Sequence, residues 1–393
     1  MGWRTRRAGL SSARRRRTQL QDAQAERRRL RRRQPLSRPP LPPTRRRSLR
    51  RDAEVAAAAA AAQPAAPAEP FSRNAFLKSE GVLGVISTSA VGHGIFTIGG
   101  ATRTVDPATI PPLVVIAAED YNRIARLIAK DMPVTIEADI RNSWRPNPPM
   151  YNVVGEIRGT DKADEVVMVG AHFDSWHAAT GATDNIAGSA VMLEAMRILK
   201  ASGVPLRRTV RIALWNGEEQ GLIGSRLYVA QHFGNIRGAG PAPPAGQTAT
   251  LAPITPEHGK LSGYFNVDNG TGAIRGVYLQ NNAAMAPIFR SWMEPLRNLG
   301  ATHIAPGNTG STDHVSFDTA GLPGFQFVQD TVEYNVFTHH TNLDTYDQLQ
   351  PEDMRRNATI VATFVYLAAN RDELLPRKPR TTAAAAAAGG RGG

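Results

Sequence analysis

Residues that can bind a metal ion follow an apolar run near the middle of the chain. The run, 166–171, has the length of a fully buried strand in a parallel sheet. His172 and Asp174 come directly after it, and Asp184 follows a loop rich in Gly and Ala. Open α/β sheets carry their chemistry at the carboxyl ends of their strands. An imidazole and two carboxylates at such an end predict a metal site.

Three further places put acids or histidines just beyond an apolar stretch. They are Glu218 and Glu219 after a predicted strand at 209–215, Asp268 after 264–267, and His339 and His340 beyond 325–328. Each pattern alone is more often solvated surface or a hydrogen-bonded loop. Their joint occurrence at strand ends favours one site at one rim of the sheet.

Histidines and carboxylates in this number suit a pair of zinc ions. Two ions about 3.5–4 Å apart need a shared carboxylate, and Asp184, at a Gly-flanked turn, is the best candidate for it. Asp174 lies two residues after His172, and we expect it to accept the second ring N–H of that histidine. Of the adjacent Glu218 and Glu219, one can bind metal while the other serves as general base toward water.

Charge is divided unevenly along the 393 residues, whose net charge is +13. Residues 1–51 hold 19 arginines and two acids, so the rest of the chain carries −4. This division removes the main support for specific nucleic-acid binding by the rest of the chain.

Cysteine is absent, which excludes disulfides, thiolate zinc sites and cysteine nucleophiles. No apolar run approaches 18 residues, so we expect no transmembrane segment, and the polyalanine at 56–62 does not make a convincing signal peptide.

Composition and periodicity divide the chain into four parts. We expect a disordered Arg/Pro/Ala-rich head at 1–70, a small β/α unit at 72–142, a larger domain at 151–376, and a disordered tail at 377–393. In the small unit, 134–140 alternates as a half-exposed strand. At the start of the larger domain, strands 151–157 and 165–171 read as a hairpin. The alternation of strands and helices that follows predicts a three-layer α/β/α fold around a mostly parallel sheet.

The strand-end motifs resemble those of the M28 family of di-zinc exopeptidases. The matching segments are His172-Phe-Asp174, Asp184-Asn185-x-x-Gly188, Asn216-Gly-Glu-Glu219, Val267-Asp268 and His340-Thr-Asn-Leu-Asp344-Thr345. Gly310-Ser-Thr-Asp-His314-x-x-Phe317 is most similar to the carboxypeptidase Q-like branch. In relatives of this kind a protease-associated domain is inserted into the catalytic domain, and 72–142 resembles it. The Arg-rich head departs from the pattern, since it stands where relatives have a signal sequence and catalytic-domain elements.

The resemblance implies a role for each site residue. It assigns His172 and Asp268 to one zinc, Glu219 and His340 to the other, Asp184 to both, and the general base to Glu218. It also implies a cis peptide bond at Asp184–Asn185. His314, Tyr334 and His339 are candidates for substrate contact, and a structural role is an equal alternative for each. The expected activity is hydrolysis of short peptides outside the cytoplasm, with either the amino or the carboxyl end of the substrate held. A homodimer is left open.

Three alternatives predict other features. A non-catalytic binding protein on the same scaffold would have lost ligands, whereas all five are present. A single-zinc glutaminyl cyclase-like transferase would leave His172 without a role. An RNA- or membrane-surface-binding protein would depend on the basic head alone.

Overall fold

The computed structural model describes residues 72–99, 109–141, 143, 149–236 and 251–378. The head expected at 1–70 and the part of the expected tail from residue 379 onward lie outside these ranges. The first two residues of that tail are described and ordered: Arg377 donates to the carbonyl of His258, and Lys378 pairs with Asp318. Within them, no helix has both the length and the apolar character that crossing a membrane requires.

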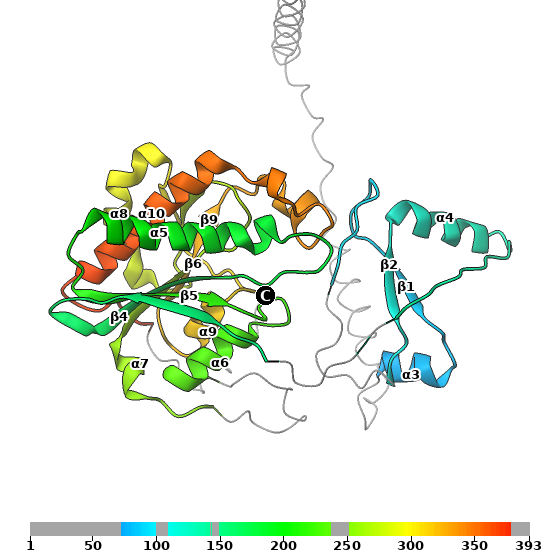
Figure 1. Cartoon of the computed structure of the whole chain (residues 1–393), viewed down its shortest axis with the longest axis horizontal. Coiled ribbons are helices and arrows are strands. Elements are labelled where there is room, and N and C mark those ends of the chain that lie inside the picture. Colours follow the sequence, from blue (N-terminus) through cyan, green and yellow to red (C-terminus); the bar gives the residue numbers. More distant parts are fainter. Residues whose placement is uncertain (1–71, 100–108, 142, 144–148, 237–250, 379–393) are drawn as a thin grey trace, which may run out of the picture. The chain divides into compact units, whose positions relative to one another are not determined.

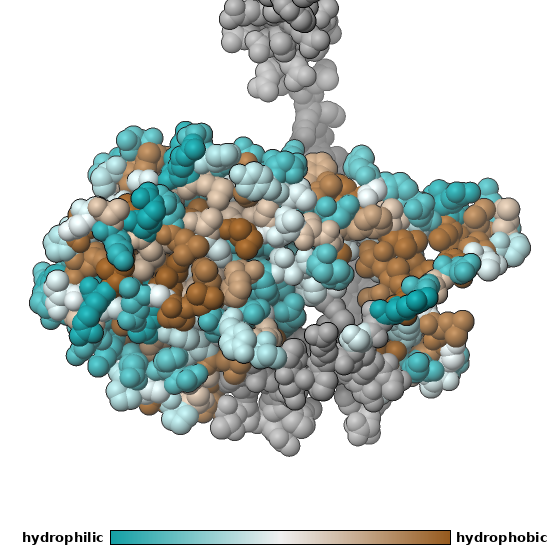
Figure 2. Space-filling view, viewed as in Figure 1, coloured by the Kyte–Doolittle hydropathy of each residue, from teal (hydrophilic) through white to brown (hydrophobic). Residues whose placement is uncertain are grey.

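The first described part is a small parallel strand pair with two helices. Its elements are α3 (Arg73–Ser79), β1 (Val85–Thr88), β2 (Leu113–Ile116) and α4 (Ala118–Ile128). The hydroxyl of Ser72 caps α3 by accepting from the backbone N–H of Ala75 at 3.3 Å. β1 and β2 pair in parallel from Val85 opposite Leu113 onward. Apolar residues gather on the face over β1 and β2 (Figure 2).

The strand expected at 134–140 is wrong. Residues 133–141 form no helix or strand, and no described strand pairs with them. Ile136 and Ile140 are 51% and 45% exposed, so the alternating side chains do not cover a core. Alternation predicts a strand only where a neighbouring strand satisfies the backbone, and that neighbour is missing here.

The larger part is built on a seven-stranded, mostly parallel sheet of order β3-β5-β4-β6-β9-β7-β8, as the sequence predicts. The strands are β3 (Val153–Ile157), β4 (Lys162–His172), β5 (Arg208–Trp215), β6 (Leu261–Asn266), β7 (Ile274–Tyr278), β8 (His303–Ala305) and β9 (Gly324–Gln329). Only the β3–β5 and β7–β9 pairs are antiparallel. The four central strands, β5, β4, β6 and β9, run in parallel and end at the same edge.

The expected hairpin of the first two strands is also wrong. β3 pairs with β5 in antiparallel fashion, and β4 lies between β5 and β6. The difference follows from burial. Val167, Met168 and Val169 of β4 are fully buried, so this strand takes a central position with helices on both faces. Val153 and Val154 of β3 are about half exposed, which fits the edge of the sheet.

Helices cover both faces of the sheet, which gives the three layers that the sequence predicts (Figure 1). They are α5 (Ala187–Ser202), α8 (Ala286–Met293) and α10 (Pro351–Asn370) on one face, and α6 (Ile223–His232), α7 (Pro256–Lys260) and α9 (His314–Thr319) on the other. Short helical turns complete the set: η2 (Ala182–Ile186), η3 (Ala283–Met285), η4 (Glu294–Leu299), η5 (Tyr334–Thr338) and η6 (Tyr346–Gln348).

Two apolar cores result from the alternation of side chains along the strands. Val167 and Val169 of β4 face the core under α5, α8 and α10, whereas Met168 faces the core with α6 and α9. In the first core, Phe364 of α10 contacts several rings, with Phe327 at a centroid distance of 5.1 Å and Phe289 at 5.5 Å.

Replacing Phe364 by Ala should lower the free energy of unfolding by about 3–5 kcal/mol, since it removes a fully buried ring from this cluster. Urea denaturation followed by circular dichroism measures the change. Leu193→Ala is the control, because Leu193 is 51% exposed on α5, and it should stay within about 0.5 kcal/mol of wild type. Equal effects of the two variants would contradict this packing.

Candidate metal centre

The predicted site residues lie at the common carboxyl edge of the central strands. His172 is the last residue of β4, Glu218 and Glu219 follow β5, Asp268 follows β6, and His339 and His340 follow η5 beyond β9. Because these strands are parallel neighbours, their ends bring the side chains together. The side chains of His172, Asp184, Glu218, Glu219 and Asp268 are each at most 8% exposed.

One group of possible metal ligands forms around His172. The Nε2 atom of His172 lies 3.2 Å from Oδ1 of Asp184 and 3.2 Å from Oδ1 of Asp268. One donor atom from each of these three residues falls within 4.8 Å of the others, close enough for a single ion.

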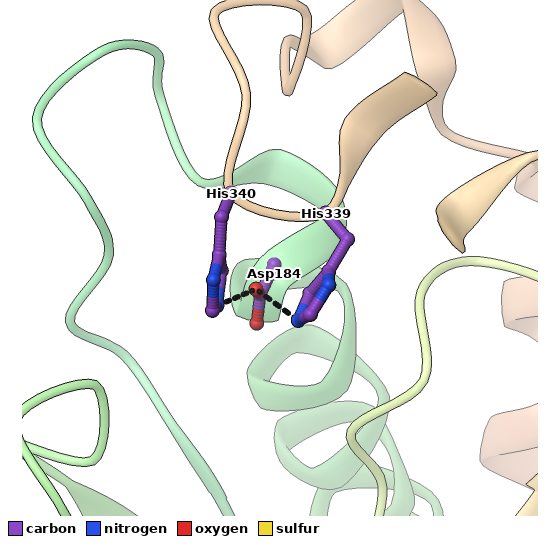
Figure 3. Close-up of side chains that lie close together, drawn as sticks. All are labelled: Asp184, His339 and His340. Carbon is purple, nitrogen blue, oxygen red and sulfur yellow. Dashed lines mark ion pairs between the residues drawn. The ribbon is translucent and has the colours of Figure 1, made fainter. Parts of the chain in front are cut away.

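A second group uses the other oxygen of Asp184. Oδ2 of Asp184 lies 3.2 Å from Nε2 of His340 and 3.8 Å from Nε2 of His339, and the two rings flank the carboxylate (Figure 3). Nε2 of His340 is also 3.0 Å from Oε2 of Glu219. Asp184 is therefore common to both groups, with one carboxylate oxygen toward each.

Glu218 lies beside these groups and belongs to neither. Its Oε2 is 3.9 Å from Nε2 of His172, and the residue is 8% exposed. Burial, reinforced by the charge of Asp268, raises the pKa of Glu218 to about 10. A carboxyl group so placed binds a proton readily.

Asp174 orients His172 with a different oxygen from the one expected. Nδ1–H of His172 donates to the backbone carbonyl of Asp174 at 2.9 Å, whereas the Asp174 carboxylate is 3.6 Å from Nδ1. That carboxylate instead accepts from the backbone N–H groups of Glu218 at 3.2 Å and Glu219 at 3.4 Å. The backbone carbonyl of Asp174 therefore orients the ring, and its carboxylate holds the loop after β5.

Asp344 holds the Asp184 segment, a role that the sequence did not reveal. Its carboxylate accepts from the backbone N–H of Thr183 at 2.6 Å and of Asp184 at 3.0 Å. The Asp184–Asn185 peptide bond is cis, as the resemblance implied. The side chain of Asn185 donates to the carbonyl of Val267 at 2.9 Å. In the sequence, Asp344 lies four residues after His340. That spacing identified the motif but did not indicate these hydrogen bonds.

The three residues expected to contact substrate do not share one environment. Tyr334 packs on His339 with ring centroids 4.8 Å apart. Burial, followed by the charge of Asp184, raises the pKa of the Tyr334 hydroxyl well above its usual range, so this hydroxyl stays protonated. His314 is fully buried and is not brought to either group: its Nε2 lies 2.9 Å from the Gln280 amide nitrogen. Burial lowers the pKa of His314 to about 4.

A further buried carboxylate, Asp313, was missed. It precedes α9 and is fully buried. Burial raises its pKa to about 7, while the nearby charge of His172 opposes that rise. Its place inside the Gly310–Phe317 motif gave no sign of this, because it follows no predicted strand.

The residues of the two groups fit divalent metal ions. Oδ2 of Asp184 and Oε1 of Glu219 are buried and receive no hydrogen bond. Across the described part of the chain, the ion pairs of the clustered carboxylates are all with histidines. Buried negative charge without a partner is costly, and cations would compensate it. Imidazole nitrogens with carboxylate oxygens form a donor set that zinc takes.

The metal-free protein should lose stability as the pH rises from about 5.5 to about 9. Burial raises the pKa of Glu218 to about 10, so the unfolded chain ionises this group long before the folded state does. Burial opposes the charge on His340, yet its contacts with Asp184 and Glu219 raise its pKa to about 9. The charge of His340 thus stabilises the folded state at low pH, and that contribution disappears as the pH approaches this value.

The midpoint of thermal unfolding, measured on chelator-treated protein across this pH range, tests the expectation. It should fall with pH, and added zinc should remove most of the fall. A midpoint that rises with pH, or equal slopes with and without zinc, would contradict it.

Comparison with known proteins agrees with this geometry. Residues 152–365 match the model of Peptidase family M28. Mouse carboxypeptidase Q is 30% identical over 266 residues, which cover 68% of this chain and 52% of that protein. The structure of a peptidase M28 precursor from Shewanella amazonensis matches with a TM-score of 0.64 at 27% identity, covering 77% of this chain and 63% of that one.

The fold is shared with a zinc aminopeptidase from Bacillus subtilis, with a TM-score of 0.52 at 21% identity over 75% of this chain and 66% of that one. The chain spans about half the length of the curated relatives it matches. The family model matches residues 152–365, and the histidines and carboxylates lie at the strand ends of the sheet within that range. The chain therefore belongs to peptidase family M28.

Proposed function

We propose that the chain is a zinc-dependent exopeptidase that hydrolyses peptide bonds of short peptides. The observation that carries this proposal is the position of Asp184, whose two carboxylate oxygens face two different sets of ligands. Membership of family M28 supports it, as does the likeness to mouse carboxypeptidase Q and to a zinc aminopeptidase.

Two zinc ions would be held, with Asp184 shared between them. His172 and Asp268 would complete one site, and Glu219 and His340 the other. His340 is favoured over His339 because its Nε2 lies nearer to Asp184, at 3.2 Å against 3.8 Å, and also contacts Glu219. His339 packs on Tyr334 instead.

Glu218 would act as the general base. When bound, the zinc ions would supply polarisation of the scissile carbonyl and a lower pKa for water. Glu218 would take the proton of the attacking water and pass it to the leaving amine. Its burial beside both groups keeps bulk water away from the proton transfer. Tyr334, whose ring packs on His339, would contact the substrate.

Neither the non-catalytic binding protein nor the single-zinc transferase gains specific support from the structure. All five proposed ligands are present and lie together, which a scaffold without catalysis would not require. His172 lies inside the first group, whereas a single-zinc transferase would leave it without a role.

The domain assignment and location belong to the same proposal. The strand pair β1–β2 and helix α4 support a protease-associated domain at 72–142, beside a catalytic domain at 151–376. The likeness to carboxypeptidase Q supports an enzyme that works outside the cytoplasm.

Glu218→Gln should lower kcat for dipeptide hydrolysis by about 10²–10⁴-fold, the usual contribution of a positioned base. Zinc content should not change, because Glu218 belongs to neither ligand group. Full-length protein is assayed with unblocked dipeptides beside Glu194→Gln, which changes a glutamate of α5 whose side chain is 41% exposed. Full activity in Glu218→Gln, or loss of zinc from it, would remove Glu218 from the proposed role.

Asp184→Asn should lose both zinc ions, whereas His172→Ala and His340→Ala should each lose one. The reason is that Asp184 is shared while each histidine belongs to a single group. Zinc per chain after dialysis, measured by plasma mass spectrometry, distinguishes these results. Loss of one ion from Asp184→Asn, with the other retained at full occupancy, would contradict a shared ligand.

A further inference from the structure

His340 is held differently from the other proposed histidine ligand. It lies in the loop after η5, and its side chain is 32% exposed, whereas that of His172 is 1% exposed at the end of β4. The ring of His172 is oriented by a hydrogen bond from Nδ1 to the carbonyl of Asp174. Within the described residues, the polar contacts of the His340 ring are all made by Nε2, to Asp184 and Glu219. Other contacts must therefore fix this ring and its backbone.

The backbone of His340 has a conformation that residues with a side chain seldom adopt. Its φ angle is 58°, in the left-handed region. Such a conformation persists only where the surrounding structure holds it. The contacts that hold it come from residues 96–98, which pair with residues 340–342. We call this pairing the clasp.

The clasp fixes the backbone on the C-terminal side of the His340 ring. Ile98 N–H donates to the carbonyl of His340 at 2.7 Å, and the middle residues of the two segments form an antiparallel bridge. At the other end, Phe96 N–H donates to Oδ1 of Asn342 at 2.8 Å, and Asn342 N–H donates back to the Phe96 carbonyl at 3.2 Å. Asn342 thus contributes the side-chain hydrogen bond of the clasp.

Residues 96–98 are in turn held by the small strand-pair unit. Ser89, directly after β1, accepts from the backbone N–H of Thr97 at 3.1 Å, and the Thr97 hydroxyl accepts from the N–H of Ala90 at 3.0 Å. The carboxylate of Glu119 on α4 accepts from the N–H of His93 at 2.6 Å. The clasp therefore connects β1 and α4 to the loop that carries a proposed zinc ligand.

Two neighbouring rings complete the surroundings of the His340 ring. Trp176 meets it edge-on, with ring centroids 6.1 Å apart at 73°, and His339 packs on it at 3.9 Å. Ring packing limits how the side chain tilts, while the clasp limits where its backbone lies. Together they hold Nε2 of His340 near the carboxylates of Asp184 and Glu219.

We propose that Asn342 is a positioning residue for His340, and that the clasp links the second zinc site to the small unit. The proposal rests on the proposed function, since it concerns one of the two zinc sites. Zinc bound at His340 would favour the closed clasp. By thermodynamic reciprocity, the closed clasp would favour zinc there by the same factor. The first site, at His172 and Asp268, is built on the ends of β4 and β6 and should not depend on the clasp.

Zinc affinity in variants that keep one site tests this selectivity. It is measured on full-length protein by competition with a chromophoric chelator. His172→Ala keeps the second site, and His340→Ala keeps the first. Asn342→Ala should weaken zinc binding about 10–100-fold in the His172→Ala protein, the usual cost of losing a contact that orients a metal ligand. It should leave zinc binding unchanged in the His340→Ala protein.

Two further variants separate positioning from a general loss of structure. Asn342→Asp keeps an oxygen that can accept from Phe96 N–H and should keep the zinc affinity of the second site. Asn122→Ala is the matched control, since it changes an exposed asparagine of α4 in the same small unit. Equal weakening of both sites by Asn342→Ala, or no weakening in the His172→Ala protein, would overturn the proposal.

Hydrogen exchange in the wild-type protein reports on the clasp without hydrolysis and without removal of a ligand. The amides of Phe96 and Ile98 both donate across the clasp, so zinc should slow their exchange by about fivefold or more, the lower end of usual coupling between sites. The slowing should be lost in Asn342→Ala, and amides within α4 should exchange equally with and without zinc.

Exchange of Phe96 and Ile98 that zinc leaves unchanged would overturn the proposal. Slowed exchange together with selective weakening by Asn342→Ala would support the clasp even if wild type cleaved no dipeptide. In that case the peptidase proposal alone would fail.

Discussion

Negative charge is gathered at the carboxyl edge of the sheet to a degree that side chains alone do not balance. Asp184, Glu218, Glu219 and Asp268 lie nearly out of water around His172 and His340. Burial and the charge of Asp268 raise the pKa of Glu218. Burial also opposes the charge of Asp184, yet its contacts with His172 and His340 lower the pKa of Asp184. Divalent cations would favour the ionised carboxylates. The surrounding strands and loops hold these carboxylates together.

Backbone hydrogen bonds to other carboxylates do much of that holding. Asp174, after β4, accepts from the amides of Glu218 and Glu219 after β5. Asp344, in the loop after His340, accepts from the amide of Asp184. The carbonyl of His340 in turn accepts from Ile98. Each contact joins segments that are distant in sequence, so the ligand loops are fixed to one another as well as to their strands.

The sequence predicted the central sheet and the members of the site because both have local signals. The continuous apolar run at 166–171 indicates a strand buried on both faces, and ligands at strand ends follow from parallel pairing. Strand neighbours have no such local signal, which explains the wrong hairpin between β3 and β4. β8, with three residues, and α9, with six, are too short to show a periodic pattern in the sequence. The burial of His314 and the hydrogen bonds of Asp344 depend on tertiary contacts that no spacing encodes.

The proposed function depends on one carboxylate, Asp184, that two metal ions would share. The most direct measurement is an anomalous difference map at the zinc absorption edge from crystals of the zinc-loaded protein. We expect two peaks about 3.5–4 Å apart on opposite sides of the Asp184 carboxylate. One peak should lie beside His172 and Asp268, and the other beside Glu219 and His340. A single peak, or a pair that does not contact Asp184, would contradict it.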